Sequence, residues 1–193
     1  MSEKVLDCVV AEVKDCRKCL LWKTRKNAVS GEGNSKSKIM LVGEAPGRQE
    51  DLTGRPFVGA AGKFLETLLD EIGLSRNDVF ICNVLKCRPP QNRQPRPDEI
   101  QTCTPYLNMQ IKALKPRVVV TLGNHSTAHV FAEVSLPFKG ITQAHGKPQK
   151  ATIAGRKVTI FPTYHPAAAL YNGAYRKQLT EDFQVLRKML AGE

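Results

Sequence analysis

KIMLVGEAPG, residues 38–47, begins with an apolar run typical of a buried strand and ends in a glycine-rich turn. Three further β-branched runs follow along the chain: VFICNV from Val79, RVVVTL from Arg117 and KVTIFPT from Lys157. Each run is apolar at nearly every position, which is typical of parallel strands buried on both faces. The four runs therefore predict a central parallel sheet.

Amphipathic segments separate these strands. Apolar residues recur at helical spacing over 64–72, and Gly73 follows where a C-terminal cap belongs. A second helix is expected over 97–115 with a kink at Pro105 and with Pro116 beyond its end, a shorter one over 125–132, and a closing one over 175–190. Strands that alternate with helices predict an α/β fold, a three-layer α/β/α sandwich with a parallel sheet of about four strands.

The chain is short enough for a single domain, residues 1–193. Two stretches show no clear periodicity: residues 30–38, and residues 137–156, where an extra hairpin could form. The protein is expected to be a monomer.

The net charge is strongly positive. Twenty-nine Lys and Arg against eighteen Asp and Glu give +11, which favours a polyanionic partner such as nucleic acid over a merely soluble basic surface. No signal peptide and no segment of membrane-spanning length is evident, so a cytoplasmic protein without a membrane partner is expected. Because disulfides are rare in that compartment, the six cysteines suggest metal binding first.

Chemically useful residues follow each predicted strand. They are the GEAPG turn from Gly43, then Asn83, then Gly123-Asn124, and then YHPAA from Tyr164. In an open parallel sheet, the loops beyond the carboxyl ends of the strands converge on one crevice. All four strand ends are therefore expected to share one pocket.

Five segments together resemble the family-4 uracil-DNA glycosylases, the iron–sulfur branch of that superfamily. They are GEAPGRQED (43–51), TGRPFVGAAG (53–62), Asn83, KCRPPQNRQPRPDE (86–99) and YHPAAAL (164–170). The resemblance extends from about Cys16 to the C-terminal helix. It implies removal of uracil from single- or double-stranded DNA, initiating base excision repair.

The resemblance assigns the pocket residues. Excision requires the nucleotide to be flipped into a pocket that stacks on its ring and reads its edge. Phe57 would stack on uracil, and Asn83 would contact its O4 and N3 edge. Its amide offers one donor and one acceptor, which suits uracil and mismatches cytosine. His165 would donate to O2, where negative charge develops as the bond breaks.

The turn after the first strand would complete the uracil site with Gly43, Ala45 and Gly47. Related glycosylases with a GQDPY motif carry an Asp where this chain has Ala45 and a Tyr where it has Gly47, so another group must exclude the thymine methyl group. Glu50 is the candidate for that exclusion. Glu44 or Glu50 would orient water or stabilise the sugar cation, and either could instead anchor a loop. A dissociative mechanism without a covalent enzyme intermediate is expected.

DNA contacts are expected from Leu170, which follows the HPAA motif and could fill the gap left by the flipped base or belong to the core. Arg88 is expected to face DNA phosphates. A sliding-clamp contact is conceivable for a repair enzyme, although the sequence contains no motif for it.

The resemblance also assigns a 4Fe-4S cluster to Cys16, Cys19, Cys87 and Cys103, tying the N-terminal segment to the rest of the domain. Four thiolates suit tetrahedral zinc equally well, so spacing alone leaves both metals open. Cys8 and Cys82 are expected to be packing residues. A non-enzymatic electron-transfer protein and a zinc-stabilised nucleic-acid-binding module remain as alternatives, and His125, His129 and His145 have no predicted role.

Overall fold

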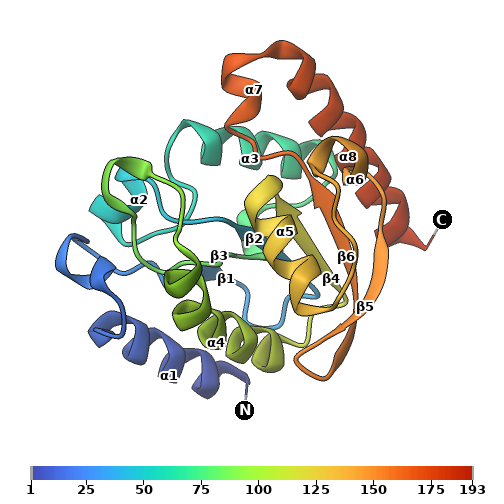
Figure 1. Ribbon diagram of the computed structural model, residues 1–193. Helices are drawn as coiled ribbons and strands as arrows, with labels where there is room; N and C mark the ends of the chain where they lie inside the picture. Colours follow the sequence, from blue (N-terminus) through green and yellow to red (C-terminus); the bar gives the residue numbers. More distant parts are fainter. Residues whose placement is uncertain (1, 193) are drawn as a thin grey trace.

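The computed structural model describes residues 2–192 and contains one six-stranded sheet in the order β1-β3-β2-β4-β6-β5 (Figure 1). The four central strands are parallel and correspond to the four predicted runs: β2 (Ile39–Gly43), β3 (Phe80–Asn83), β4 (Val118–Leu122) and β6 (Arg156–Thr163). The predicted α/β sandwich is confirmed.

The sheet has two more strands than predicted, and both are antiparallel edges. β1 (Glu32–Gly33) pairs with β3 and lies in the stretch expected to be loose. β5 (Gln149–Ile153) forms a hairpin with β6, in the region where an extra hairpin was expected. β1 is only two residues long and has no apolar alternation, so the sequence carried no pattern for it.

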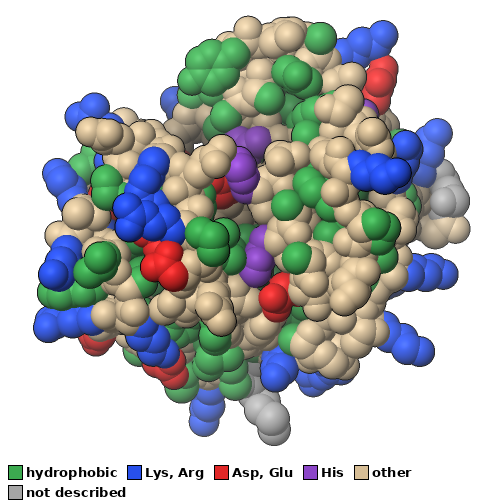
Figure 2. Space-filling model, viewed as in Figure 1, with side chains coloured by type: hydrophobic (Ala, Val, Ile, Leu, Met, Phe, Trp, Pro, Cys, Tyr) green, Lys and Arg blue, Asp and Glu red, His purple; other side chains and the backbone are tan. Residues whose placement is uncertain are grey.

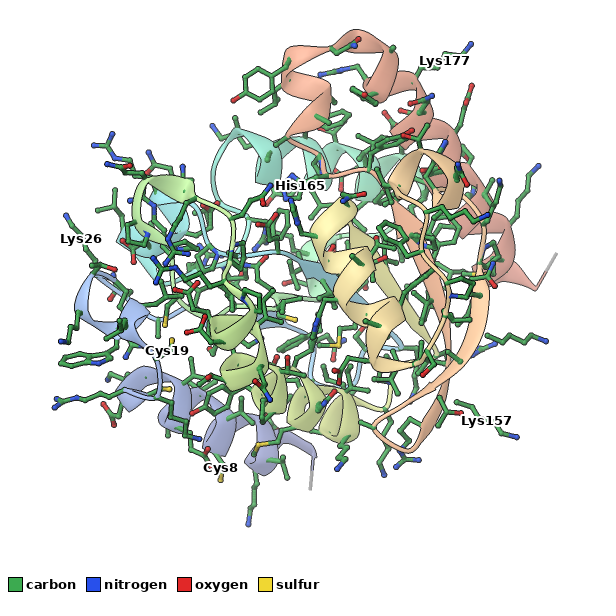
Figure 3. All side chains as sticks on the ribbon, viewed as in Figure 1. Cys8, Cys19, Lys26, Lys157, His165 and Lys177 are labelled. Atoms are coloured by element: carbon green, nitrogen blue, oxygen red, sulfur yellow. The ribbon has the colours of Figure 1, made fainter. Side chains whose placement is uncertain are left out.

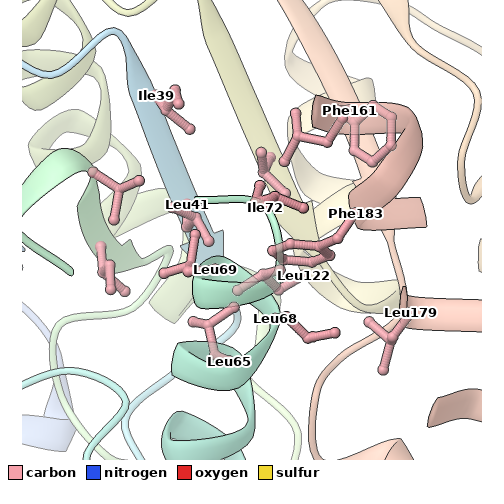
Figure 4. Close-up of a cluster of buried hydrophobic side chains, with 14 of the residues drawn as sticks. Ile39, Leu41, Leu65, Leu68, Leu69, Ile72, Leu122, Phe161, Leu179 and Phe183 are labelled. Carbon is pink, nitrogen blue, oxygen red and sulfur yellow. The ribbon is translucent and has the colours of Figure 1, made fainter. Parts of the chain in front are cut away.

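Helices cover both faces of the sheet. α3 (Ala60–Glu71) and α8 (Gly173–Ala191) pack on one face, and α1 (Ser2–Asp15), α4 (Pro97–Leu114) and α5 (Asn124–Glu133) pack on the other. Successive residues of β2 alternate between the two cores: Ile39 and Leu41 face α3, whereas Met40 and Val42 face α4. Figure 4 shows the first core, where side chains from α3 and α8 meet Leu122 and Phe161 of the sheet.

Short helical segments complete the chain. They are α2 (Arg48–Thr53), α6 (Ile141–Ala144), α7 (Ala168–Tyr171) and the 3-10 turns Leu20–Lys23, Arg76–Asp78 and Pro90–Asn92. α4 runs through Pro105 as a single element. Within residues 2–192, no helix combines the length and the apolar character needed to cross a bilayer.

Candidate active site

A cavity of about 340 Å³ opens at the carboxyl ends of the parallel strands. This volume lies within the range of small-molecule sites. Figure 2 shows histidine side chains near the middle of this face of the molecule, and of the histidines only His165 is among the residues that line the cavity. Its lining residues come from the turn after β2, the segment before α3, the end of β3, the loop before α4 and the segment after β6: Glu44, Ala45, Pro46, Gly47, Glu50, Phe57, Ala61, Asn83, Pro89, Asn92, Arg93, His165 and Ala167.

Three of the four predicted strand ends meet in this cavity, and the prediction that β4 also lines it is wrong. Gly123 instead lies behind His165, because a β-carbon on Gly123 would stand 2.9 Å from the His165 β-carbon. Asn124 accepts a hydrogen bond from the Ile141 amide at 3.1 Å. The end of β4 therefore packs behind the segment after β6 that carries His165.

Phe57 is held in a strained conformation. Its φ of 51° lies in the left-handed region, which non-glycine residues rarely adopt. Arg76 fixes this backbone by donating to the Phe57 carbonyl at 2.9 Å and to the Pro56 carbonyl at 2.7 Å. Gly62 packs directly against the Phe57 carbonyl, where a β-carbon would overlap it. The ring consequently stacks beside His165, with centroids 5.6 Å apart and planes 28° from parallel.

Asn83 ends β3 and is only 2 % exposed. Its side-chain amide makes no hydrogen bond to any of residues 2–192 described here, so both its donor and its acceptor are available to a ligand. Gly43 leaves the space between this amide and the Phe57 ring open. A β-carbon on Gly43 would lie 2.8 Å from Phe57 Cζ and would overlap Asn83 Oδ1.

His165 is fixed as a neutral donor. The Ala167 amide donates to His165 Nδ1 at 3.1 Å, so Nδ1 acts as an acceptor and the ring proton is assigned to Nε2. Burial lowers the pKa of His165 to about 4, against a smaller raising effect of the Glu50 charge. At neutral pH the ring is uncharged and can donate one hydrogen bond from Nε2.

The carboxylates of Glu44 and Glu50 differ in whether their oxygens are available to a ligand. Glu50 is fully engaged with backbone: its Oε1 accepts from Val58 and Gly59 at 3.0 Å each, and its Oε2 accepts from Gly47 at 3.1 Å. Glu50 therefore anchors the loop. Glu44 lines the cavity, and its carboxylate has no hydrogen-bond partner among the described residues. Burial raises the pKa of Glu44, and the nearby His125 charge opposes that shift.

The cavity rim combines basic and apolar groups. Arg93 lines the cavity and pairs with buried Glu99 at 2.6 Å. Arg88 donates to Asn92 at 2.7 Å and thereby holds a loop in which Asn92 has a left-handed φ of 54°. Arg93 was not singled out from the sequence, although it lies in the same motif as Arg88.

α7 directly follows the lining residue Ala167 and carries exposed apolar side chains. Leu170 is 45 % exposed, which excludes the core position considered for it. The adjacent Tyr171 is 90 % exposed and was not singled out from the sequence. Ala167, the N-cap of α7, lines the cavity, and Leu170 and Tyr171 follow it within four residues.

Four free cysteines gather around one small core between α1 and α4. Cys87 and Cys103 belong to that core, and Cys16 and Cys19 pack against it. Figure 3 shows Cys19 on the N-terminal segment, well away from His165, and Cys8 at the outer edge of α1. Cys8 is exposed, so the expectation that it packs in the interior is wrong, whereas Cys82 is buried.

The donor set fits an anionic centre. Arg25 donates to Cys87 Sγ at 3.0 Å, and the Lys86 amide donates to Cys103 Sγ at 3.3 Å. Over residues 2–192, no three His, Cys, Asp or Glu side chains lie close enough to hold a single metal ion. A cluster of several irons binds one thiolate per iron, so its four thiolates can stand further apart than the four around one zinc ion.

Two of the remaining histidines, His129 and His145, have structural partners, and His129 Nε2 lies 3.2 Å from Thr104 Oγ1. His145 Nδ1 lies 3.0 Å from buried Asp182, which also accepts from Thr163 at the end of β6 at 2.6 Å. The His145 ring packs on Tyr164, the residue before His165, with centroids 4.5 Å apart. This network connects the segment after β6, which carries His165, to α8.

Comparison with known proteins agrees with this geometry. The family model described as "Uracil DNA glycosylase superfamily" matches residues 30–187. A "Type-4 uracil-DNA glycosylase" of Saccharolobus solfataricus is 53% identical over 97% of this chain and 88% of its own length. One of Thermotoga maritima with the same description is 43% identical over 99% and 97%.

A more distant match is a "Type-5 uracil-DNA glycosylase" of Pyrobaculum aerophilum, 31% identical over 80% of this chain and 72% of that protein. The family match covers most of the chain, and the relatives are matched over most of their own length. Together with the pocket, they show that this chain belongs to the uracil-DNA glycosylase superfamily.

Proposed function

We propose that this protein is a uracil-DNA glycosylase that hydrolyses the N-glycosidic bond of uracil in DNA and leaves an abasic site. The observation that carries the proposal is the convergence of the Phe57 ring, the free Asn83 amide and the Nε2 donor of His165 in one strand-end cavity. The relatives described as type-4 uracil-DNA glycosylases support the same activity.

Recognition uses the shape of the cavity and one amide. Phe57 stacks on the flipped base, and Gly43, Ala45 and Gly47 allow the base to lie close to the backbone. The Asn83 amide presents its donor to O4 and its acceptor to N3–H, a pattern that cytosine does not match. Glu50 contributes by holding Gly47 and Gly59 on one wall, so thymine exclusion depends on the position of that wall.

Catalysis depends on the charge that develops on the leaving base. His165 donates from Nε2 to O2, and its ring needs no change of protonation at neutral pH because Nδ1 already accepts from Ala167. Glu44 is the carboxylate with unoccupied oxygens at the cavity, and we assign to it the orientation of water and stabilisation of the sugar cation. No covalent enzyme intermediate is required.

DNA is contacted at the rim. Arg93 and Arg88 face the backbone phosphates, and Leu170 enters the gap left by the flipped nucleotide. The net charge of +11 favours this polyanionic substrate.

Cys16, Cys19, Cys87 and Cys103 would hold a 4Fe-4S cluster. Bound there, the cluster supplies four iron–thiolate crosslinks between the N-terminal segment, the loop after β3 and α4. Arg25 and the Lys86 amide stabilise the thiolates by donating to Cys87 and Cys103. The centre lies outside the catalytic cavity, whose lining includes none of these cysteines.

The test is incubation of the purified protein with a labelled duplex carrying one uracil, beside matched thymine and cytosine duplexes, followed by alkaline cleavage. Cleavage at the uracil position alone is expected. A folded, brown protein that leaves all three duplexes intact would contradict the proposal.

A further inference from the structure

Asp182 of α8 is a buried carboxylate, and both of its hydrogen-bond donors lie close to the segment that carries His165. Asp182 is 4 % exposed. Its Oδ2 accepts from the Thr163 hydroxyl at 2.6 Å, and His145 Nδ1 lies 3.0 Å from Oδ1 and 3.1 Å from Oδ2. Because a carboxylate accepts hydrogen bonds, the ring proton of His145 is assigned to Nδ1. Burial raises the pKa of Asp182, and the hydrogen bonds from Thr163 and His145 oppose that rise.

Both donors also hold the carboxyl end of β6. Thr163 is the last residue of that strand. The His145 ring packs on the ring of Tyr164, which is itself 4 % exposed and contacts Tyr175 of α8 with ring centroids 4.9 Å apart. The Tyr164 ring is therefore held by α8 and by the segment after α6, immediately before His165.

Gly146 brings the segment after α6 against the same strand. Its amide donates to the Pro162 carbonyl at 2.9 Å. Its φ of 68° is left-handed, and a β-carbon at this position would lie 2.6 Å from Asp182 Oδ1, so glycine permits the close approach. The three residues that precede His165 are thus each held by a separate contact.

The position of the His165 ring depends on the backbone that carries it. Within residues 2–192, the ring makes one hydrogen bond, which the Ala167 amide donates to Nδ1 at 3.1 Å. Its Nε2 donor therefore has no protein partner that would fix it in place. A misplacement of about 1 Å in a reacting group can cost about 10²-fold in rate.

We propose that Asp182 and His145 are positioning residues for uracil excision, which hold the end of β6 so that His165 Nε2 meets O2 of the leaving base. Neither side chain lines the cavity, so both act through His165 and not on the substrate. This inference rests on the proposed function and deepens it.

The test compares Asp182→Asn with Ser37→Ala, at a temperature where both proteins are folded. Asparagine has nearly the same shape as aspartate, but its amide group cannot accept from both donors. Ser37 is 5 % exposed, and its hydroxyl donates to the Ile39 and Asp78 carbonyls at 2.8 and 2.7 Å. It precedes β2 at the amino end of the sheet, so its variant loses buried hydrogen bonds away from the cavity.

The first two quantities are the single-turnover excision rate at saturating protein and the affinity for a duplex with one 2′-fluorinated deoxyuridine, which resists glycosidic cleavage. Asp182→Asn should slow excision by roughly tenfold, because the donor is displaced from the developing charge. Affinity for the uncleaved duplex should stay within about twofold, because the donor acts mainly in the transition state. Ser37→Ala should change neither quantity.

Combination with His165→Ala shows whether Asp182 acts through His165. In that background, Asp182→Asn should change the residual rate by less than about twofold, because the donor that it positions is already gone. An equal loss from Asp182→Asn in both backgrounds would overturn the inference.

Nitrogen NMR of histidine-labelled protein gives a readout that needs no substrate. The chain has four histidines, and the spectrum shows which ring nitrogen carries the proton in each. The wild-type His165 ring should be protonated on Nε2. Asp182→Asn should shift these signals towards a mixture of tautomers, because a displaced segment weakens the contact with Ala167, whereas Ser37→Ala should leave them unchanged. Wild-type His165 signals in folded Asp182→Asn would overturn the inference.

Thr163→Val and His145→Ala test the two donors separately, and they keep the inference testable if Asp182→Asn does not fold. Each removes one hydrogen bond to Asp182 and should shift the His165 signals in the same direction by a smaller amount. Wild-type signals in both variants would contradict the positioning role. Absence of uracil excision by the wild type would contradict the proposed function alone, because the spectra are recorded without DNA.

Discussion

Replacement of His165 by Ala removes one hydrogen-bond donor from the position where the leaving uracil gains negative charge. Loss of one such preorganised donor slows comparable reactions by about 10²–10³-fold, or roughly 2.7–4 kcal/mol of transition-state stabilisation. The single-turnover rate on a uracil duplex should fall by one to three powers of ten. Affinity for a uracil-free duplex should remain, because His165 lies inside the cavity and not on its basic rim.

The protonation state of His165 provides a sharper test of this reasoning. With a pKa of about 4, roughly one ring in a thousand carries a second proton at pH 7. His165 should therefore contribute no titration to the single-turnover rate between pH 5.5 and 9. Because the folded pKa is lowered, the folded state binds fewer protons than the unfolded state, and stability falls as pH decreases from about 6.5 towards 4.

The assay is quench-flow excision across that pH range, with thermal unfolding of wild type and His165→Gln in parallel. The glutamine variant should lose less stability on acidification than the wild type. The single-turnover excision rate of the wild type could instead change with an apparent pKa near 6.5. If that change were absent from His165→Gln, it would refute the assignment of His165 as a neutral donor. So would a His165→Ala protein that loses less than threefold in rate.

Three further changes test other parts of the site. Gly43→Ala places a β-carbon 2.8 Å from Phe57 Cζ and against Asn83 Oδ1, so affinity for a uracil analogue duplex should fall at least tenfold relative to affinity for a thymine duplex. Glu44→Gln should slow excision by about 10–10²-fold. Because burial raises the pKa of Glu44, the wild-type rate should decline in acid at a pH above that of a free glutamate, and a variant that keeps this acidic limb would argue against the assignment. Asp182→Asn disturbs buried hydrogen bonds beside the segment that carries His165 and should cost about 1–3 kcal/mol in denaturant unfolding, so a midpoint identical to that of wild type would contradict its structural role.

The central sheet could be predicted because β2, β3 and β4 are buried along their whole length and β6 is buried over its second half, so that each parallel strand contains a largely apolar run. The two antiparallel edge strands could not be predicted in the same way. β1 pairs over two residues, Glu32 and Gly33, which carry no periodic signal. β5 begins with exposed residues and is recognisable mainly through its pairing with β6.

For the pocket too, some features could be predicted from the sequence and others could not. Asn83 and His165 lie together because strand ends converge, and topology alone supports that expectation. Phe57 lies between α2 and α3, so its place in the pocket was expected from the family resemblance and not from topology. The sequence could not choose between Glu44 and Glu50 as the available carboxylate. That distinction depends on three backbone amides that fold onto Glu50, and such contacts leave no local pattern.

The histidine tautomer and the buried lysine also required the structure. His165 is a neutral donor because of one amide two residues away in a tight turn. Lys86 belongs to a motif of polar residues, yet it is almost fully buried, which composition would not suggest for lysine.

The measurement that tests the central claim most directly is the excision rate of wild type and Asn83→Asp on duplexes that differ only in carrying uracil or cytosine. The wild type should excise uracil alone. The Asp side chain of the variant lacks the amide donor. Asn83→Asp should therefore excise uracil more slowly and excise cytosine detectably, so that the ratio of the uracil rate to the cytosine rate falls. An Asn83→Asp protein with undiminished preference for uracil would show that the strand-end amide does not read the base, and the account of this pocket would fail.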